Sequence, residues 1–446
     1  MLSRLVANAR ILRADNGAEV TCDELHRTGE RPLVWSLDER KRLVARQVTE
    51  VTPGGRDEAF TLRLASGRSL EATADCLFML LDGWRRVGDL EAGDRLAVPR
   101  RVPEPRSTHC MADDEVVLLA HMIGDGSCVK NQPTRYASID EQNLAAVANA
   151  AKHFGVTVVR DEYPAARVIT LRLPAPYRVT HGKRNPIVAW LDGLGLFDKR
   201  SHEKFVPPEV FAVPDEQIAL FLRHLWATDG CIKWDGKGGQ GRIYYASTSR
   251  RLSEDVRHLL LRLGIPSRAY RIPQGSYRDI WHLHVSGVGH QMRFLRTVDA
   301  HGAKFFDARA VFAQLEGIKS NENVDTVPRE VWDQVRQGLS DQRMTHRAFA
   351  EAMQTKFCGS TMWKHSPSRG RLHRAAAVLD DRTLHDLTNN DVFWDKVVEI
   401  SSVGEREVYR ITVVDADNVV VQGVSVRAHL AIGVANASAR LQGRTN

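Results

Sequence analysis

Two nine-residue runs constrain the fold of this chain most strongly: residues 118–126 (LLAHMIGDG) and residues 222–230 (LRHLWATDG). Each run is apolar and helix-like, and each ends in Asp-Gly. A glycine directly after an apolar helix favours a left-handed cap, so we expect Asp125 and Asp229 at or near helix C-termini. The helix dipole is negative there and favours a bound cation. If the two helices pack side by side, the carboxylates meet as hard oxygen ligands that suit Mg²⁺ better than a soft metal.

This pair of runs resembles the LAGLIDADG (dodecapeptide) homing endonucleases. Lys204 in HEKFVPPEVF matches a Lys-x-Ile-Pro element before the second run, and YYASTSRRLSEDVRHLLLRLGIPSR matches the strand and helix that follow it. The resemblance implies two helices at a pseudo-two-fold interface, whose aspartates hold divalent metals over two DNA strands. A single run of this kind would more often be an ordinary buried helix. The second copy favours the functional interpretation.

The resemblance implies metal-assisted hydrolysis of phosphodiester bonds. Asp125 and Asp229 would hold Mg²⁺ or Mn²⁺, with the backbone carbonyls of Gly124 and Thr228 as further ligands. Lys204 is the candidate for stabilising the developing charge. Double-stranded DNA is the expected partner of this site.

Two features of the runs depart from the family pattern. His224 stands where the family prefers a small residue such as Ala120, so we expect a wider helix crossing above the metal site. No clear second lysine follows the second run, because Lys233 is near only in sequence.

The two ends of the chain follow a different pattern. Residues 9–105 are rich in short strands and turns, and Ser66 and Gly67 stand between two alternating runs as a hairpin signal. This stretch, which includes DGWRRVGDLEAGDRLAVPRR, resembles the N-terminal part of a Hint domain, the self-splicing fold of inteins. Residues 392–428 resemble its C-terminal part. A β-fold interrupted by a paired-helix domain is the architecture of a large intein, as in actinobacterial recombinase or replicative-helicase inteins.

Splicing requires a Cys or Ser nucleophile at the first position, an assisting His, and a terminal His-Asn pair. The equivalent positions are degenerate: Arg4 or Leu5 at the start, Cys76 after Thr73 in place of the His, and Arg427 with Ala428 at the end. A later Asn436 lies beyond the expected place. We therefore expect protein splicing to be impaired.

The expected fold class is multidomain: an all-β Hint horseshoe formed by both chain ends, an inserted α/β LAGLIDADG domain of two pseudo-symmetric repeats, and a small helical subdomain. The expected boundaries are residues 1–105 and 389–430 for the two Hint parts, 110–320 for the endonuclease, 325–388 for the helical subdomain, and 431–446 for a tail.

The helical subdomain is basic and resembles a helix-turn-helix. Its candidate DNA contacts are Thr361, Trp363 and Lys364 near a reading helix, and Arg369, Arg371 and Arg374 for phosphates. A helical hairpin with a basic face is an equally good interpretation.

Alternation in the strands of the central block predicts further DNA contacts. In DIWHLHVSG, the face with Trp281, Leu283 and Val285 is expected to pack on helices, leaving the histidine face toward DNA. The candidates on these strands are Arg167, Arg172, Arg242, Arg268, His282 and His284. For any single residue, an exposed strand face with incidental charge is the simpler alternative.

The charge balance agrees with a nucleic-acid partner, since 62 Lys and Arg against 55 Asp and Glu give a net charge of +7. No apolar run reaches the length of a membrane span and the N-terminus lacks the apolar core of a secretory signal, so we expect a cytoplasmic monomer without membrane contact. Three functions remain open: a DNA endonuclease in a splicing-defective scaffold, a working splicing element, and a DNA-binding remnant that has lost cleavage.

Overall fold

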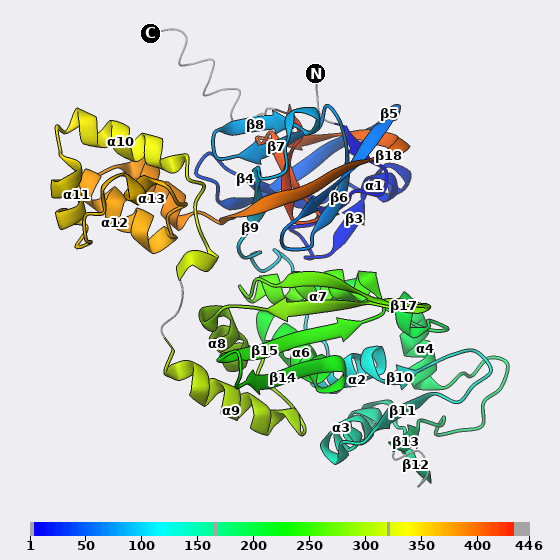
Figure 1. The fold of residues 1–446 in the computed structure, drawn as a ribbon. Helices are drawn as coiled ribbons and strands as arrows, with labels where there is room; N and C mark the ends of the chain where they lie inside the picture. The colour runs from blue at the N-terminus through cyan, green and yellow to red at the C-terminus, as the bar shows by residue number, and fades with distance from the viewer. Residues whose placement is uncertain (1–3, 164–167, 319–321, 432–446) are drawn as a thin grey trace. The chain divides into compact units, whose positions relative to one another are not determined.

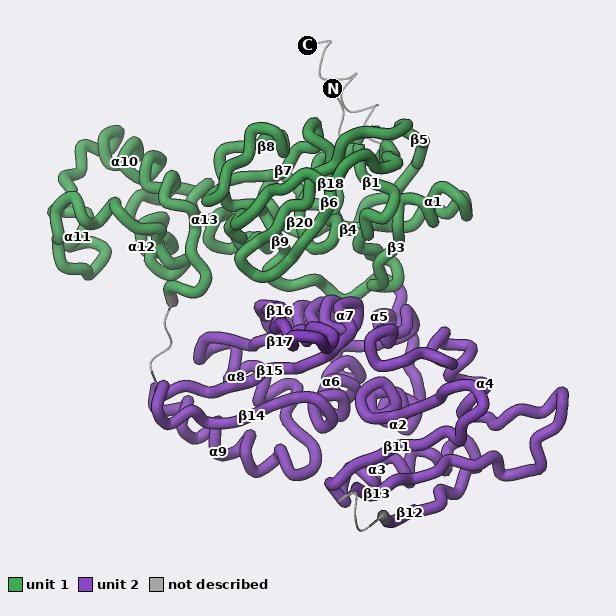
Figure 2. Tube along the Cα trace, turned by 45° about the vertical axis from the view of Figure 1, so that its right-hand side comes forward, with its two compact units in different colours: residues 1–106, 321–446 green, residues 107–320 purple. Residues whose placement is uncertain are grey.

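The computed structural model describes residues 4–163, 168–318 and 322–431. The chain forms two compact units, one of residues 1–106 with 321–446 and one of residues 107–320 (Figure 2). Both sheets and helices are present in each unit. The protein is therefore a multidomain α/β protein, as the sequence predicted. Within the described residues, no helix combines the length and apolar character needed to span a bilayer.

Unit 1 contains strands from both ends of the chain (Figure 1). The N-terminal part supplies β1 (Leu5–Val6), β2 (Arg10–Leu12), β3 (Glu19–Thr21), α1 (Cys22–Thr28), β4 (Leu33–Leu37), β5 (Leu43–Leu64), β6 (Ser69–Thr73), β7 (Leu77–Leu80), β8 (Gly83–Arg86), the 3-10 turn η1 (Val87–Asp89) and β9 (Arg95–Pro99). The C-terminal part supplies β18 (Val392–Val414), β19 (Asn418–Val421), β20 (Val424–Arg427) and β21 (His429–Ala431).

These strands form two sheets, and each sheet contains strands from both the N-terminal and the C-terminal parts. One has the order β21-β18-β1-β6-β5-β4 with β9 also on β18, and the other has the order β3-β2-β19-β20-β7-β8. The long strands β5 and β18 pair antiparallel from Leu64 opposite Val397 to Val48 opposite Val413. The predicted hairpin is confirmed, because Arg63 pairs with Ser69 across a turn in which Gly67 has a φ of 79°.

The remaining part of unit 1 is a helical segment. It consists of the 3-10 turn η5 (Glu322–Val324), α10 (Val331–Asp341), α11 (His346–Ala352), the 3-10 turn η6 (Gly359–Trp363), α12 (Arg369–Leu379) and α13 (Arg382–Asn389). Trp332, Phe349 and Leu372 are buried at its centre. Arg369 is also buried, where it pairs with Asp325 at 2.9 Å.

Unit 2 repeats one topology twice. The first copy is α2 (Asp113–Gly124), β10 (Gly126–Ser127), β11 (Arg135–Ser138), α3 (Glu141–Ala151) with η2 (Lys152–Phe154), β12 (Val159–Tyr163), β13 (Val168–Arg172) and α4 (Pro186–Gly193). The second copy is α6 (Asp215–Asp229), β14 (Gly230–Asp235), β15 (Gln240–Ser247), α7 (Arg250–Arg262), β16 (Arg268–Gln274), β17 (Tyr277–Val285) and α8 (Val288–Thr297). The turn η4 (Ser201–Glu203) and α5 (Pro208–Phe211) join the copies, and α9 (Lys304–Glu316) follows the second.

The two sheets of unit 2 have the same strand order, β10-β11-β13-β12 and β14-β15-β17-β16. Each first strand directly follows the first helix of its copy, and these two helices, α2 and α6, pack against each other. The pairing of equivalent helices brings the ends of both sequence runs to one place.

Candidate functional site

The two helices end where the sequence predicted, but for a different reason. Gly230 after α6 has φ −80° and ψ 155°, and Gly126 is likewise outside the left-handed region. The predicted left-handed caps are therefore wrong. A Cβ on Gly126 would lie 2.5 Å from Met122 Cα, and one on Gly230 would lie 2.2 Å from Trp226 Cδ1. Glycine is required because the chain folds back against the preceding turn.

The last turns of α2 and α6 approach each other at Gly124 and Thr228. A Cβ on Gly124 would lie 2.1 Å from Thr228 Oγ1 and 2.5 Å from Thr228 Cβ. The Thr228 hydroxyl is fixed because it donates to the Leu225 carbonyl at 2.6 Å. The small residues of the sequence runs thus meet where the helices end, and the aspartates that follow are brought together.

Asp125 and Asp229 both face solvent at these helix ends. The surrounding protein nevertheless removes much of the water from around each carboxylate. This desolvation, followed by the negative charge of Asp229, raises the pKa of Asp125 to about 6. Desolvation also raises the pKa of Asp229, against the opposing charges of Lys304 and Lys204. The arrangement therefore concentrates negative charge at a place that a cation or phosphate-bound metal can reach.

Lys204 lies at the end of α2, as the resemblance implied. Its Nζ donates to the carbonyl oxygens of Met122, Ile123, Gly124 and Gly126 at 2.8–3.2 Å. Burial lowers its pKa to about 8, against the opposing charges of Asp229 and Asp125. The ammonium group satisfies carbonyls that a helix end leaves without partners.

Lys304 is the residue that the sequence analysis missed. Its Nζ donates to the carbonyl oxygens of Trp226, Ala227 and Thr228 at 2.7–3.0 Å, so it caps α6 as Lys204 caps α2. Burial lowers its pKa as well. Each lysine follows the last helix of its own copy, so aligning the two copies by topology would have found it. Lys233 instead lies on β14 and is exposed.

The carbonyl oxygens of Gly124 and Thr228, predicted as metal ligands, accept hydrogen bonds from the two lysines at 3.2 and 2.7 Å. Each carbonyl oxygen has a second lone pair, so ligation of a metal remains a prediction. The carboxylates are the only anionic donors among these four residues.

The strand candidates for DNA contact have different surroundings. Leu283 and Val285 are buried as predicted, and His282 and His284 stack on Tyr244 with ring centroids 4.8 and 5.1 Å apart. Arg172 and Arg242 are exposed but ion-paired, with Asp161 and Asp235 respectively. Arg268 is exposed and lies opposite His284 in the register of β16 and β17. Arg167 lies outside the described residues.

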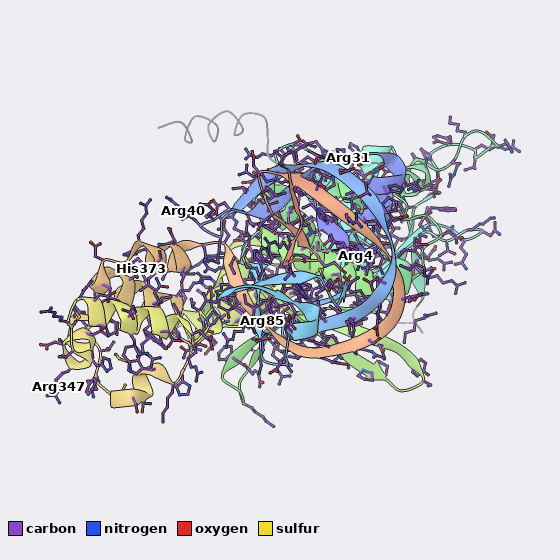
Figure 3. All side chains as sticks on the ribbon, turned by 90° about the horizontal axis from the view of Figure 1, so that it is seen from above. Arg4, Arg31, Arg40, Arg85, Arg347 and His373 are labelled. Carbon is purple, nitrogen blue, oxygen red and sulfur yellow. The ribbon has the colours of Figure 1, made fainter. Side chains whose placement is uncertain are left out.

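The helical segment does not contain the predicted reading helix. Residues 359–363 form a 3-10 turn, and Trp363 packs on Trp332 with ring centroids 5.1 Å apart. Arg371 covers the Trp332 ring at 5.2 Å, and the buried Arg369 pairs with Asp325. Trp363, Arg369 and Arg371 thus pack the segment together. Lys364 and Arg374 are exposed, and Figure 3 shows Arg347 and His373 on the same segment.

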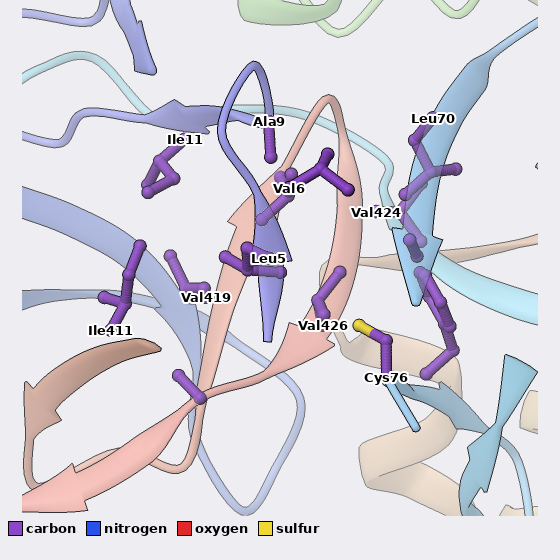
Figure 4. Packing of buried hydrophobic residues seen from close by; sticks show 14 of the residues in the cluster. Leu5, Val6, Ala9, Ile11, Leu70, Cys76, Ile411, Val419, Val424 and Val426 are labelled. Atoms are coloured by element: carbon purple, nitrogen blue, oxygen red, sulfur yellow. The ribbon is translucent and has the colours of Figure 1, made fainter. Parts of the chain in front are cut away.

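Three of the positions equivalent to the splicing residues, Leu5, Cys76 and Ala428, are buried in the apolar core of unit 1. Figure 4 shows Leu5, Cys76 and Val426 in one cluster, and their exposed fractions are 3%, 0% and 1%. Thr73 still donates from Oγ1 to the Arg4 carbonyl oxygen at 3.3 Å. At the other end, Ala428 is buried and the Arg427 guanidinium lies over the Trp84 ring. Asn436 lies outside the described residues.

Comparison with known families matches residues 216–299 to the LAGLIDADG-like domain. The chain is 34% identical to the replicative DNA helicase DnaB of Synechocystis over 88% of this chain and 46% of that protein. It is 37% identical to DnaB of Rhodothermus marinus over 88% of this chain and 42% of that protein. It is 25% identical to RecA of Mycobacterium tuberculosis over 89% and 52%. The chain spans about half the length of the curated relatives it matches.

Two solved structures also resemble parts of the chain. A DnaB intein from Synechocystis has 27% identity and covers 22% of this chain and 70% of its own, with a TM-score of 0.21. I-DmoI in complex with DNA and Mn has 15% identity and covers 42% of this chain and 96% of its own, with a TM-score of 0.29.

Proposed function

We propose that this chain, which is similar to an intein and to a LAGLIDADG homing endonuclease, cleaves both strands of DNA at a specific site with divalent metal ions. One observation carries the proposal. Equivalent helices of two repeats place Asp125 and Asp229 together at solvent, and an equivalent lysine caps each helix. Each repeat supplies one aspartate and one lysine, and two such sets suit a DNA duplex, which has two backbone strands.

The donor set fits Mg²⁺ or Mn²⁺, because hard cations prefer carboxylate and carbonyl oxygens. The raised pKa of Asp125 reflects desolvation and the negative charge of Asp229, which a divalent ion would offset. When bound, the ion would polarise the phosphate and lower the pKa of a metal-bound water. Asp125 and Asp229 would hold it, with the Gly124 and Thr228 carbonyl oxygens available as neutral ligands.

Lys204 and Lys304 perform a separate task in this proposal. Their ammonium groups hold the last turns of α2 and α6 and keep positive charge beside the two carboxylates. Positive charge fixed before the reaction stabilises developing negative charge on a phosphate without reorganisation. The lysines therefore both position the aspartates and favour the transition state.

Double-stranded DNA would lie across the two four-stranded sheets. Each sheet follows one of the paired helices, so both sheets begin at the carboxylates. Arg172, Arg242 and Arg268 are exposed on these sheets, and Arg172 and Arg242 would exchange their carboxylate partners for phosphates. Because both halves of the site belong to one chain, a monomer would suffice.

Protein splicing is impaired in this proposal. Neither Leu5 nor Arg4 offers a nucleophile, and Ala428 has no side-chain amide to cyclise. The burial of Leu5 and Cys76 in the apolar core of unit 1 supports the same interpretation. Expression of the chain between two reporter segments tests it: an unspliced fusion is expected, and joined reporters would contradict it.

Cleavage tests the main proposal. The purified chain would be incubated with Mg²⁺ and a DNA library that includes uninterrupted replicative-helicase genes, beside the Asp125→Asn variant. Double-strand cuts at one sequence, absent with the variant, are the expected result. DNA binding without cuts, by a folded protein, would contradict cleavage and indicate a DNA-binding remnant.

A further inference from the structure

Three histidines meet inside unit 2. Two of them lie on the same helices as the carboxylate cluster, but they offer ring nitrogens as ligands and the aspartates offer oxygens. His121 lies on α2, His224 lies on α6, and His301 lies between α8 and α9. One ring nitrogen from each lies within 4.8 Å of the other two. Among the described residues, these histidines are the one group of three or more His, Cys, Asp or Glu side chains whose ligand atoms come this close together.

The spacing is close to that of a metal site. His121 Nε2 and His224 Nδ1 are 3.0 Å apart. Two nitrogens on one tetrahedral zinc ion, each bound at about 2.0–2.1 Å, lie about 3.3 Å apart. The third ring belongs to a half-buried residue in a connection between helices, and its centroid is 4.4 Å from that of His224. Its ligand nitrogen lies within 4.8 Å of the other two, so this side chain would move closer when an ion binds.

His121 Nε2 and His224 Nδ1 share a hydrogen bond, so one of the two nitrogens holds a proton that must move to another ring nitrogen or be released when an ion binds. His301 Nε2 lies 3.3 Å from the Gln142 carbonyl oxygen, which can only accept, so this nitrogen is assigned the proton and Nδ1 the lone pair. His121 Nδ1 lies 3.0 Å from the Tyr136 hydroxyl, which leaves Nε2 to face His224. Contacts of this kind to the second ring nitrogen orient metal-binding histidines.

The rings are also in the protonation state that ligation needs. Burial, and then the charges of the other two histidines, lower the pKa of His121 well below its usual value. Burial likewise lowers the pKa of His224 to about 3. Neutral imidazoles suit Zn²⁺, Co²⁺, Ni²⁺ and Cu²⁺, whereas Mg²⁺ prefers oxygen. The three histidines and the two aspartates therefore select different ions.

We propose that His121, His224 and His301 form a three-imidazole site that binds one divalent ion of the zinc class, with a solvent molecule as fourth ligand. The ion would join α2 of the first repeat to α6 and the α8–α9 connection of the second. The same connection leads directly into Lys304, so the ion would also hold the segment that carries this lysine. This site stands independently of DNA cleavage.

Metal binding by the chelator-treated full chain tests the proposal. We would titrate Co²⁺ and follow its visible absorption, then compete with Zn²⁺, in a Cys110→Ser and Cys358→Ser background because those thiols are exposed. One ion per chain is expected, with a spectrum of nitrogen and oxygen ligation and a Zn²⁺-dependent rise in Tm. Absence of stoichiometric binding would overturn the site.

Matched variants locate the ion. His301→Ala and His224→Gln are each expected to weaken binding by at least the about 10- to 100-fold that loss of an outer-shell partner costs. His181→Ala, at an exposed histidine elsewhere in unit 2, is expected to leave binding unchanged. The Asp125→Asn and Asp229→Asn double variant is expected to bind Zn²⁺ like the parent. Equal binding by His301→Ala and the parent, both folded by circular dichroism, would overturn the proposal. Loss of the ion in the double aspartate variant would do the same, because the carboxylates would then be the ligands.

Discussion

Lys304 caps α6 as Lys204 caps α2, and both ammonium groups bind the backbone carbonyls of the turn that precedes an aspartate. The two contacts join residues far apart in the sequence by the same geometry. This equivalence extends the repeat beyond helices and sheets to the charged groups of the site.

Replacing Lys304 by Met is expected to reduce the rate of DNA cleavage by about a hundredfold or more, the scale of losing one fixed charge-stabilising group. DNA affinity is expected to fall much less, since the ammonium group contacts helix carbonyls. Single-turnover cleavage and a gel-shift titration separate the two effects. Lys233→Met is the matched control, because Lys233 is exposed on β14. Equal cleavage rates for Lys304→Met and Lys233→Met would show that Lys304 does not contribute to cleavage.

Asp125→Asn is expected to abolish Mg²⁺-dependent cleavage and leave DNA binding largely intact, because the amide is a weak ligand for a hard cation. Nicking and double-strand cleavage would be followed on one plasmid substrate, and binding by fluorescence anisotropy. Asp114→Asn, at the exposed N-terminal end of the same helix, is the control and is expected to cleave normally. Full cleavage by Asp125→Asn would rule out the metal-site assignment.

Gly124→Ala is expected to destabilise unit 2 by about 1–3 kcal/mol, because the new methyl group overlaps the Thr228 side chain and pushes the helices apart. Urea unfolding measures the change. Gly193→Ala, at the end of α4, is the control: its Cβ meets nothing within 4 Å, so stability is expected to stay within about 1 kcal/mol. Similar stability of the two variants would show that the helices do not touch at Gly124.

The contribution of neutral His224 to the stability of the metal-free chain is expected to fall between pH 7 and pH 5. The pKa of folded His224 is about 3, whereas an unfolded histidine has a pKa of about 6.5. The unfolded state therefore binds the proton first, so the stability due to neutral His224 is complete above pH 6.5 and declines as the pH falls toward 3.

His224→Gln removes this contribution. Between pH 7 and pH 5, its free energy of unfolding is expected to fall by up to about 2 kcal/mol less than that of the parent. Denaturant unfolding at pH 7 and pH 5, with EDTA present, measures the difference. The carboxylates of Asp125 and Asp229 are common to both proteins and cancel. Identical pH dependence in the two proteins would mean that His224 is not buried as a neutral ring.

Local sequence was sufficient for features that depend on neighbours along the chain. The helix ends at Asp125 and Asp229 followed from apolar runs that stop at Asp-Gly, and the hairpin at Gly67 followed from a turn residue between alternating strands. The reason for the glycines was not accessible in the same way. It depends on a clash with Met122 and Trp226 in the turn before, which appears only when the chain is folded.

Tertiary structure decided which distant side chains share one place. Lys304 and His301 gain their partners by contacts between the end of the second repeat and helices that begin far earlier in the chain, and no local pattern encodes such contacts. The same is true of Trp363 and Arg371, whose basic and aromatic pattern suggested DNA contact but which pack on Trp332. The sequence by itself determined where each helix stops and what chemistry its last residue carries, because short-range sterics set those features. Packing determined the rest, because the free energy of burial depends on partners brought together by the whole fold.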